Sequence, residues 1–401
     1  MASILIAWQL GNHYGHLTAD LPVAQALREG GHHVLFAVRD PRVAVEVLTP
    51  AGFEFLPIPL PQSLPGVADA PISYSDILLA AGFGDELTAL GLTRSWVSLL
   101  ELARPDVLVA DHAPMALVAA RARGIPSVAI GSGFTVPPAM SPAPSIRTWE
   151  DISLSRRVAA DERALAGING VLEALGAAPL DTVPLLFGSG SALLTTFPEL
   201  DHYGPRDDCV YLGPVSAPLR SAPKSWQPGP GPRIFAYLRA TVPRVDAVLS
   251  ALEVCGAQVL CAMPGASAEL IQHFAGTPIT MTTTPLPAAA LLEHADLTVT
   301  YGGQGLIATS LLAGVPLLLV PQTVEQYGGA KLVEHLGAGI CLAFDRDEPR
   351  VAAAVRQLLA DARSRDAARD FASRHADFDA GGAARRGAEM IARRAGDKTP
   401  D

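Results

Sequence analysis

A glycine-rich turn between two short apolar segments constrains the fold of this chain most. The apolar segment Leu297–Thr300 is followed by the turn Tyr301–Gly305, whose sequence is YGGQG, and then by the helical stretch Leu306–Leu312. A second apolar segment, Val315–Val320, predicts another buried strand, and a further helix is expected from about Val324. This order is typical of an α/β protein that presents backbone N–H groups to an anion at a helix N-terminus. Glycines allow the sharp turn and the close approach of a ligand.

The beginning of the chain has the same order of elements. Ser3–Trp8 predicts a buried strand, Gln9–Gly15 a turn, Leu17–Gly30 a helix and His33–Val38 the next strand. The crossover between two such parallel strands is expected to be right-handed. A later strand, Pro105–Asp111, ends in a carboxylate. The fold class predicted from these patterns is α/β.

The domain boundary is predicted from length and from one proline-rich segment. A chain of 401 residues is too long for one core and is expected to form two domains. The segment from Gly213 to Pro232, GPVSAPLRSAPKSWQPGPGP, has little periodicity and predicts a linker. We therefore predict a domain over 1–214, a linker over 215–232, a second domain over 233–380, and a helix with a frayed tail over 381–401.

Composition excludes several classes of function. The net charge is −10 and no run of Lys or Arg occurs, which argues against a nucleic-acid partner. No apolar run approaches the ~20 residues of a membrane helix, and the start MASILIAW lacks the basic region of a signal peptide. The chain is therefore expected to have no transmembrane segment and to be cytoplasmic. The cysteines lack CxxC spacing and predict core thiols in a reducing compartment, not a metal site: Cys209, Cys255, Cys261 and Cys341.

The glycine-rich segment resembles the donor-binding segment of GT-B glycosyltransferases. The residues that carry this resemblance are, in order, Gly302-Gly303, Gly314-Val315-Pro316, Pro321 and Glu325-Gln326. The pattern is most similar to family-1 enzymes of the bacterial natural-product and macrolide type, and it is strongest at 1–40, 104–130 and 284–342. The resemblance implies two Rossmann-like domains that face each other across a cleft. It assigns the acceptor to the first domain and the nucleotide sugar to the second, and returns the C-terminal helix to the first domain.

The resemblance assigns catalysis to His16 and Asp111. The histidine of the Gly15-His16 pair would be the general base for the acceptor hydroxyl, and a histidine at the end of the first strand suits that role. Asp111 would hydrogen-bond the histidine and stabilise its charged form, as the acid of a triad does. The structural alternatives are an exposed loop histidine and a helix-capping aspartate. His13 is the rival base and otherwise an acceptor-binding residue.

The donor side contains both matches and departures. The resemblance implies that Glu325 and Gln326 hold the sugar hydroxyls and that the turn and its helix bind the diphosphate. Tyr301 stands where the family has histidine, Leu306 where it has Ser or Thr, Thr309 where plant members have glutamate, and Gly329 where it has asparagine. The residues predicted to bind nucleotide and diphosphate are Arg239, Leu286, Tyr301, Gly302, Gly303, Gln304 and Gly305. Arg239 would supply positive charge and Leu286 would pack on the base; a solvated arginine and a simple turn are the alternatives.

The acceptor side is predicted from two apolar, proline-rich stretches, 60–95 and 131–150. Their large side chains Phe83, Phe134, Met140 and Trp149 would line a hydrophobic cleft, with ordinary core packing as the alternative.

The resemblance implies an inverting, metal-independent transfer of a sugar from a UDP or dTDP donor to a hydroxyl group, or alternatively a carbon nucleophile, of a hydrophobic acceptor, without a further cofactor. The first alternative is an auxiliary or non-catalytic subunit with a degenerate donor site, and the second is an epimerase on the same fold. A homodimer is left open.

Overall fold

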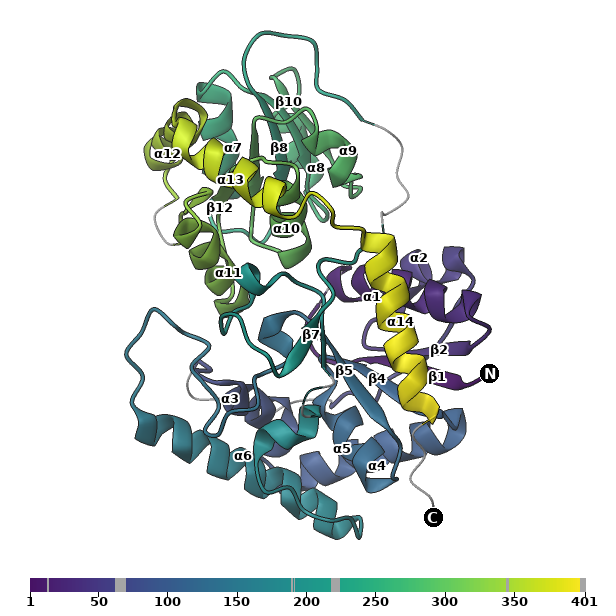
Figure 1. Ribbon diagram of the computed structural model, residues 1–401. Helices are drawn as coiled ribbons and strands as arrows, with labels where there is room; N and C mark the ends of the chain where they lie inside the picture. Colours follow the sequence, from purple (N-terminus) through teal and green to yellow (C-terminus); the bar gives the residue numbers. More distant parts are fainter. Residues whose placement is uncertain are drawn as a thin grey trace. The chain divides into compact units, whose positions relative to one another are not determined.

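The computed structural model describes residues 1–12, 14–61, 70–188, 190, 192–217, 224–343 and 346–396. The chain divides into two compact units, and each is built on its own parallel sheet (Figure 1). Unit 1 comprises Met1–Ala217 together with Asp379–Asp401, and unit 2 comprises Pro218–Phe378. The α/β class with two parallel-sheet domains, predicted from the sequence, is confirmed.

Unit 1 contains a seven-stranded sheet whose strands all run parallel. Its spatial order is β3 (Glu54–Pro57), β2 (His33–Val38), β1 (Ser3–Trp8), β4 (Val107–Asp111), β5 (Ser127–Gly131), β6 (Ala192–Leu194) and β7 (Cys209–Tyr211). The order reverses between β1 and β4, because the chain winds outward from β1 in one direction and from β4 in the other. In open parallel sheets the carboxyl ends at such a reversal form the ligand-binding edge.

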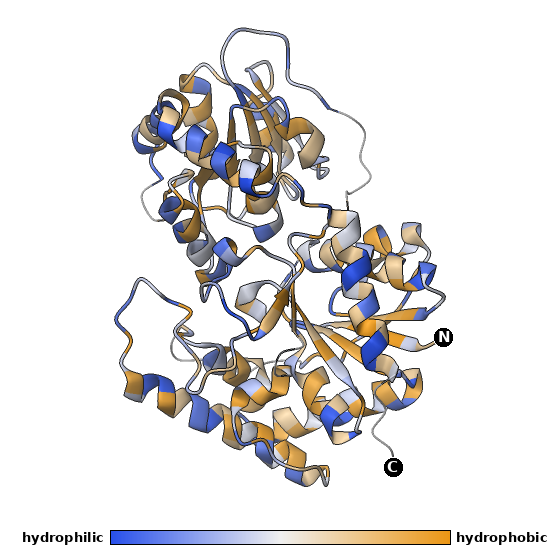
Figure 2. Cartoon of the chain, viewed as in Figure 1, coloured by the Kyte–Doolittle hydropathy of each residue, from blue (hydrophilic) through white to orange (hydrophobic). Residues whose placement is uncertain are grey.

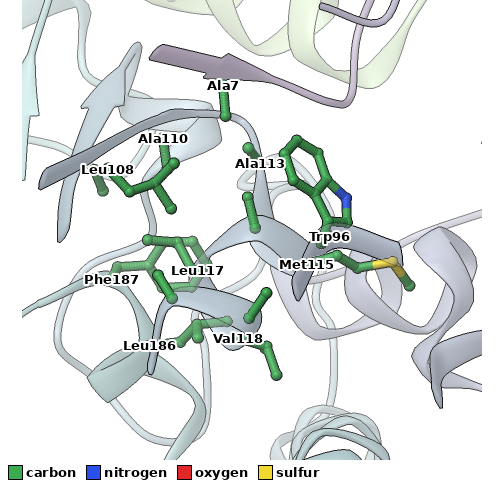
Figure 3. Close-up of a cluster of buried hydrophobic side chains, with 14 of the residues drawn as sticks. Ala7, Trp96, Leu108, Ala110, Ala113, Met115, Leu117, Val118, Leu186 and Phe187 are labelled. Atoms are coloured by element: carbon green, nitrogen blue, oxygen red, sulfur yellow. The ribbon is translucent and has the colours of Figure 1, made fainter. Parts of the chain in front are cut away.

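The helices of unit 1 cover both faces of this sheet. They are α1 (Gly15–Glu29), α2 (Pro41–Val47), α3 (Tyr74–Leu78), α4 (Glu86–Ala103), α5 (Pro114–Ala122), α6 (Leu154–Ala174) and α14 (Ala380–Gly396). On one face, Ala7 of β1 and Leu108 of β4 pack with Met115 of α5 and Trp96 of α4 (Figure 3). Burial of this apolar surface is the main driving force for the packing of α4 and α5 on the sheet.

One long helix was not predicted from the sequence. Helix α4 occupies 86–103, partly within the stretch expected to line an acceptor cleft. Asp85 caps it, since its carboxyl accepts a hydrogen bond from the Thr88 N–H at 2.9 Å. Phe83, just before the cap, lies inside the core cluster of unit 1. This placement favours packing over acceptor binding for Phe83.

The C-terminal helix α14 packs on α1 within unit 1. Arg386 of α14 donates hydrogen bonds to the carbonyls of Tyr211 and Leu212 at 3.4 and 3.3 Å.

A further hydrogen bond to α1 depends on a proline inside this helix. Pro22 has no N–H, so the carbonyl of Thr18 lacks its usual helical partner. That carbonyl accepts a hydrogen bond from the Ala217 N–H at 2.7 Å, which ties the end of the first segment of unit 1 to α1.

Unit 2 contains a six-stranded parallel sheet. Its order is β10 (Ile279–Thr282), β9 (Gln258–Ala262), β8 (Arg233–Tyr237), β11 (Leu297–Thr300), β12 (Leu317–Leu319) and β13 (Gly339–Cys341). The helices are α7 (Val245–Val254), α8 (Ala268–His273), α9 (Ala288–Leu292), α10 (Gln304–Leu312), α11 (Val324–His335), α12 (Glu348–Ala360) and α13 (Ala362–Arg374). In both units the strands are mainly hydrophobic and the outer helical surfaces carry the hydrophilic residues (Figure 2). Within the described part of the chain, no helix combines the length and apolar character needed to cross a membrane.

Candidate active site

The carboxyl ends of β1 and β4 bring His16 and Asp111 together in unit 1. These strands are adjacent, with Trp8 in register with Asp111, the last residue of β4. Helix α1 starts at Gly15, so His16 lies in its first turn, directly above this edge. Nδ1 of His16 lies 2.6 Å from Oδ2 of Asp111, and the two side chains are 20% and 4% exposed. The predicted pair is thus within hydrogen-bonding distance.

The His16 ring is held on two further sides. It stacks on the indole of Trp8, with ring centroids 5.5 Å apart and planes inclined by 22°. On the other side lies Gly11, whose φ is +82° and where a Cβ atom would clash with Nε2 of His16. When Asp111 is a carboxylate, it accepts a hydrogen bond from the Nδ1–H group of His16. The neutral ring then carries its lone pair on Nε2. That is the arrangement required of a general base.

Two buried titratable residues adjoin this pair. His112 follows Asp111 in the left-handed conformation, with φ of +47°. Burial, together with the charges of His16 and Arg39, lowers the pKa of His112 to about 3, so its imidazole is neutral at neutral pH. Asp20 of α1 is 3% exposed. Burial and the neighbouring Asp111 raise the pKa of the Asp20 carboxyl well above its ordinary value.

Asp20 was not predicted as a site residue, although the sequence carries a signal for it. The apolar stripe of α1 passes through Leu17, Leu21 and Ala24, and residue 20 lies on the same helical face, three residues after Leu17. A carboxyl group on an apolar stripe is unusual and marks a candidate functional residue.

The predicted acceptor residues lie in different environments. Phe134 sits in a short helical turn after β5 and meets the ring of His202 edge-on, with centroids 5.3 Å apart. Met140 is 57% exposed. The indole N–H of Trp149 donates to Glu150 at 3.2 Å, and Phe83 belongs to the core. His13 lies outside the described residues, so its predicted role as rival base stays a prediction.

A buried ion pair that the sequence did not reveal anchors the segment after β5. The carboxyl of Asp201 is fully buried and accepts hydrogen bonds from Arg206 Nε at 2.9 Å and from the Tyr211 hydroxyl at 2.7 Å. Arg206 also donates to the carbonyl of Val136 at 2.6 Å. Gly133 approaches Asp201 so closely that a Cβ atom would clash with the carboxyl. The segment that carries Phe134 is thereby held in one conformation.

In unit 2, the predicted diphosphate residues Arg239 and Tyr301 contact each other. They follow the adjacent strands β8 and β11, in which Tyr237 is in register with Thr300. The guanidinium carbon of Arg239 lies 4.1 Å from the centroid of the Tyr301 ring, and Nη2 donates to the phenol oxygen at 3.1 Å. A cation over an aromatic face is attracted to the ring electrons, which favours this placement of the guanidinium. Tyr301 stands at the position of the turn where the resembled family has histidine, and Arg239 reaches it from the loop after β8.

The remaining residues of the turn form the start of α10. Gly302 has φ of +96°, and a Cβ atom there would lie 3.1 Å from the carbonyl oxygen of Gln326. Gly303 is the N-cap residue, and Gln304 and Gly305 form the first turn of α10, which begins without a side-chain cap. The helix starts two residues before the predicted position. Such an N-terminus carries partial positive charge.

The sugar-side residues lie in the first turn of α11. Thr323 caps this helix by accepting a hydrogen bond from the Gln326 N–H at 3.3 Å. The side chain of Gln326 is buried, and its Oε1 accepts from the Gln322 N–H at 2.9 Å. Glu325 beside it is partly exposed. Leu286, predicted to pack on a base, is buried in an apolar cluster with residues of β8 and β9.

Comparisons with known proteins agree with this architecture. The model of the erythromycin biosynthesis protein CIII-like C-terminal domain matches residues 246–378. A PGL/p-HBAD biosynthesis glycosyltransferase of Mycobacterium tuberculosis is 28% identical over 384 residues, which cover 89% of this chain and 85% of the relative. The L-demethylnoviosyl transferase of Streptomyces niveus is 25% identical over 379 residues, which cover 90% of this chain and 91% of the relative.

Solved structures share the fold. The calicheamicin glycosyltransferase is similar with a TM-score of 0.71 at 20% identity, and the match covers 100% of both chains. A spinosyn rhamnosyltransferase complexed with thymidine diphosphate has a TM-score of 0.69 at 20% identity, over 94% of this chain and 97% of its own. These likenesses establish the architecture of both units.

Proposed function

We propose that this chain, which belongs to the family-1 natural-product glycosyltransferases with the GT-B fold, moves a sugar from a nucleoside-diphosphate donor to a hydroxyl group of an apolar small-molecule acceptor. The observation that carries the proposal is the 2.6 Å contact between Nδ1 of His16 and Asp111. This contact leaves a basic ring nitrogen at the ligand-binding edge of the sheet in unit 1.

The proposed chemistry is a single displacement. Nε2 of His16 takes the proton of the acceptor hydroxyl while the oxygen attacks the anomeric carbon and the bond to the diphosphate breaks. Attack opposite the leaving group inverts the configuration at that carbon. Asp111 stabilises the imidazolium that forms and keeps the ring in the correct orientation. His16 and Asp111 are thus the base and its positioning residue.

The leaving group requires positive charge, which residues of unit 2 are proposed to supply. Arg239, stacked on Tyr301, provides a full charge, and the N-terminus of α10 at Gly303–Gly305 adds backbone dipoles. These groups act where negative charge develops in the transition state. We therefore propose a metal-independent reaction. Glu325 and Gln326 are proposed to hold sugar hydroxyls.

The donor is proposed to be a dTDP sugar, with a UDP sugar as the second choice. Two solved relatives of the same fold, the spinosyn rhamnosyltransferase and the glycosyltransferase SsfS6, are complexed with thymidine diphosphate. The acceptor is proposed to be an aromatic or lipid-like natural product; the relatives named for PGL/p-HBAD biosynthesis and for demethylnoviosyl transfer support a role in such a biosynthetic pathway. All four cysteines are free thiols, and we place the reaction in a reducing compartment, the cytoplasm.

The first experiment is a thermal-shift panel with TDP, UDP, GDP and the three monophosphates, with EDTA present. A ligand at 100 times its Kd stabilises the folded chain by about 2.7 kcal/mol, which is easily measured. Stabilisation by one diphosphate in preference to its monophosphate is expected, followed by transfer from the matching sugar donor to phenolic and lipid acceptors. A flat response to all six nucleotides would contradict the proposal and would favour an auxiliary subunit with a degenerate donor site.

A further inference from the structure

We propose that Asp20 is a positioning residue for His16: its carboxyl keeps its proton and donates a hydrogen bond to Asp111, which sets how tightly Asp111 holds the imidazole. The inference rests on the proposed function, in which His16 is the base. It adds a third group, a buried carboxyl, to the pair.

The geometry joins the three residues at one point. Asp20 follows His16 by four positions on α1, so both side chains lie on the same helical face. Nδ1 of His16 lies 2.6 Å from the carboxyl of Asp111 at the end of β4, and the Asp20 carboxyl lies next to that of Asp111, close enough for the two groups to interact. Asp20 and Asp111 are both buried.

The proton must lie on one of the two carboxyl groups, because two buried carboxylates in contact repel each other. Oδ2 of Asp20 is buried and receives no hydrogen bond from any N–H or O–H donor in the described part of the chain. Asp111 as an anion is stabilised by the Nδ1 proton of His16. Burial and the charge of Asp111 raise the pKa of Asp20 well above its ordinary value, which agrees with a proton on Asp20.

Among the described residues, the groups that face Asp20 and Asp111 from the elements packed against α1 are mostly uncharged or paired. His112 beside Asp111 is neutral, the Tyr74 phenol of α3 is protonated because burial raises its pKa, and Arg39 after β2 donates to the carbonyl of Gln9 at 3.1 Å. Several charged groups of α2 and α14 have partners elsewhere: Arg42 with Glu46, Arg385 with Asp379, Arg386 with the carbonyls of Tyr211 and Leu212, and Arg393 with Glu389.

The consequence concerns the protonation of His16. Two donors share the negative charge of Asp111 when Asp20 is protonated, and the imidazolium is then held less tightly. His16 therefore stays unprotonated, and ready to act as a base, at a lower pH. In Asp20→Ala the imidazole is the only remaining donor of this trio, so His16 should take up its proton at a higher pH. In Asp20→Asn the amide N–H replaces the carboxyl O–H as donor.

Two spectroscopic measurements on the full chain test this without any substrate. Infrared difference spectra at neutral pH should show the carbonyl band of a protonated carboxylic acid in the wild type, and this band should disappear in Asp20→Asn. In ¹⁵N-histidine NMR titrations, the His16 signal is identified by its loss in His16→Gln. Its midpoint should rise by about one pH unit in Asp20→Ala and stay in place in Asp20→Asn.

Asp161 provides the matched control. It is also a buried aspartate of unit 1, but its carboxyl accepts hydrogen bonds from the Ser75 hydroxyl at 2.5 Å and the Ala143 N–H at 3.0 Å. Asp161→Asn should leave the band and the His16 titration unchanged. If Asp20→Ala does not fold, Asp20→Leu replaces it in the titration, and the nearly isosteric Asp20→Asn still gives the infrared result.

The absence of an Asp20-dependent band would overturn the proposal, and so would a His16 midpoint that does not move when the donor is removed. Failure of the proposed function is distinguishable from both outcomes. In that case the nucleotide panel and transfer assays are negative, whereas the band and the titration shift are still present.

Discussion

The guanidinium carbon of Arg239 lies over the ring of Tyr301, 4.1 Å from its centroid, and Nη2 donates a hydrogen bond to the phenol oxygen at 3.1 Å. Two residues 62 positions apart in the sequence are thus joined at the carboxyl ends of neighbouring strands. The tyrosine replaces a histidine of the family pattern, and the arginine adds a charge that the ring alone lacks. The contact suggests that the pair acts as one unit in binding a diphosphate.

Arg239→Ala tests the charge. The variant should weaken TDP binding by about tenfold, because one charge-assisted hydrogen bond to phosphate is lost. Isothermal titration calorimetry with TDP measures this, with thymidine as the uncharged comparison and Arg356→Ala, an exposed arginine of α12, as the control variant. Equal weakening for TDP and thymidine would point to a general loss of structure in unit 2 and would contradict the assignment.

Tyr301→His tests the position of the phenol. A histidine there restores the residue type of the family, so TDP affinity should be kept or increased, whereas Tyr301→Leu should lower it through loss of both the ring and the hydroxyl. The same calorimetric measurement serves for both. Unchanged affinity in both variants would remove Tyr301 from the donor site.

His16→Gln and Asp111→Asn test the acceptor side. His16→Gln should abolish transfer and leave TDP affinity unchanged, because the base belongs to unit 1 and TDP binding is assigned to unit 2. Asp111→Asn should lower kcat by about 10²- to 10⁴-fold, since the imidazolium loses its counter-charge and the ring its preferred tautomer. Steady-state transfer rates with the donor found in the nucleotide panel give the comparison. A parallel loss of TDP binding would instead indicate a structural role.

The sequence predicted the elements whose signals are local. The strands Ser3–Trp8, His33–Val38 and Leu297–Thr300 have the predicted limits, because each is a short apolar run bounded by turn residues. Helix α4 was missed because the loop before it is rich in proline and serine. The loop prediction was continued past the end of that loop, to residue 95. Its capping residue, Asp85, was nevertheless readable as a helix start.

Contacts between distant segments were not accessible to the same reasoning. The hydrogen bond between Thr18 and Ala217 follows from Pro22, but its partner is known only once the fold is known. The ion pair of Asp201 and Arg206 is close in sequence, yet its complete burial depends on the β5 and β7 segments that enclose it. Family resemblance pointed to His16 and Asp111, whereas Asp20 was recognised from its burial beside them, although its place on the apolar stripe of α1 was visible in the sequence.

Gly11→Ala tests how closely His16 must be confined. A Cβ atom at residue 11 would clash with Nε2 of His16, so the variant should displace the ring and lose most transfer activity. Gly124 is a matched control: its φ is also positive, at +62°, but no atom lies within 4 Å of a Cβ built there. Gly124→Ala should therefore show only the backbone strain, a modest fall in Tm with activity retained. Equal activity in the two variants would contradict a confined His16.

His112→Asn tests the buried neutral imidazole through the pH dependence of stability. The pKa of His112 is about 3 in the folded chain, against about 6.5 for an unperturbed histidine, so between these values the unfolded chain binds the extra proton. The free energy of unfolding should therefore fall as pH falls through this window, by up to about 1.4 kcal/mol per pH unit. Asparagine tolerates the left-handed conformation at this position and carries no such charge.

The measurement is urea denaturation of wild type and His112→Asn at a series of pH values between 4 and 7. Because the raised pKa of Asp20 gives the opposite slope above its ordinary value, the informative quantity is the difference between the two proteins and not either curve alone. Stability of the variant relative to wild type should rise steadily as the pH is lowered. A difference that is independent of pH would show that His112 takes up its proton at an ordinary pH, in contact with solvent.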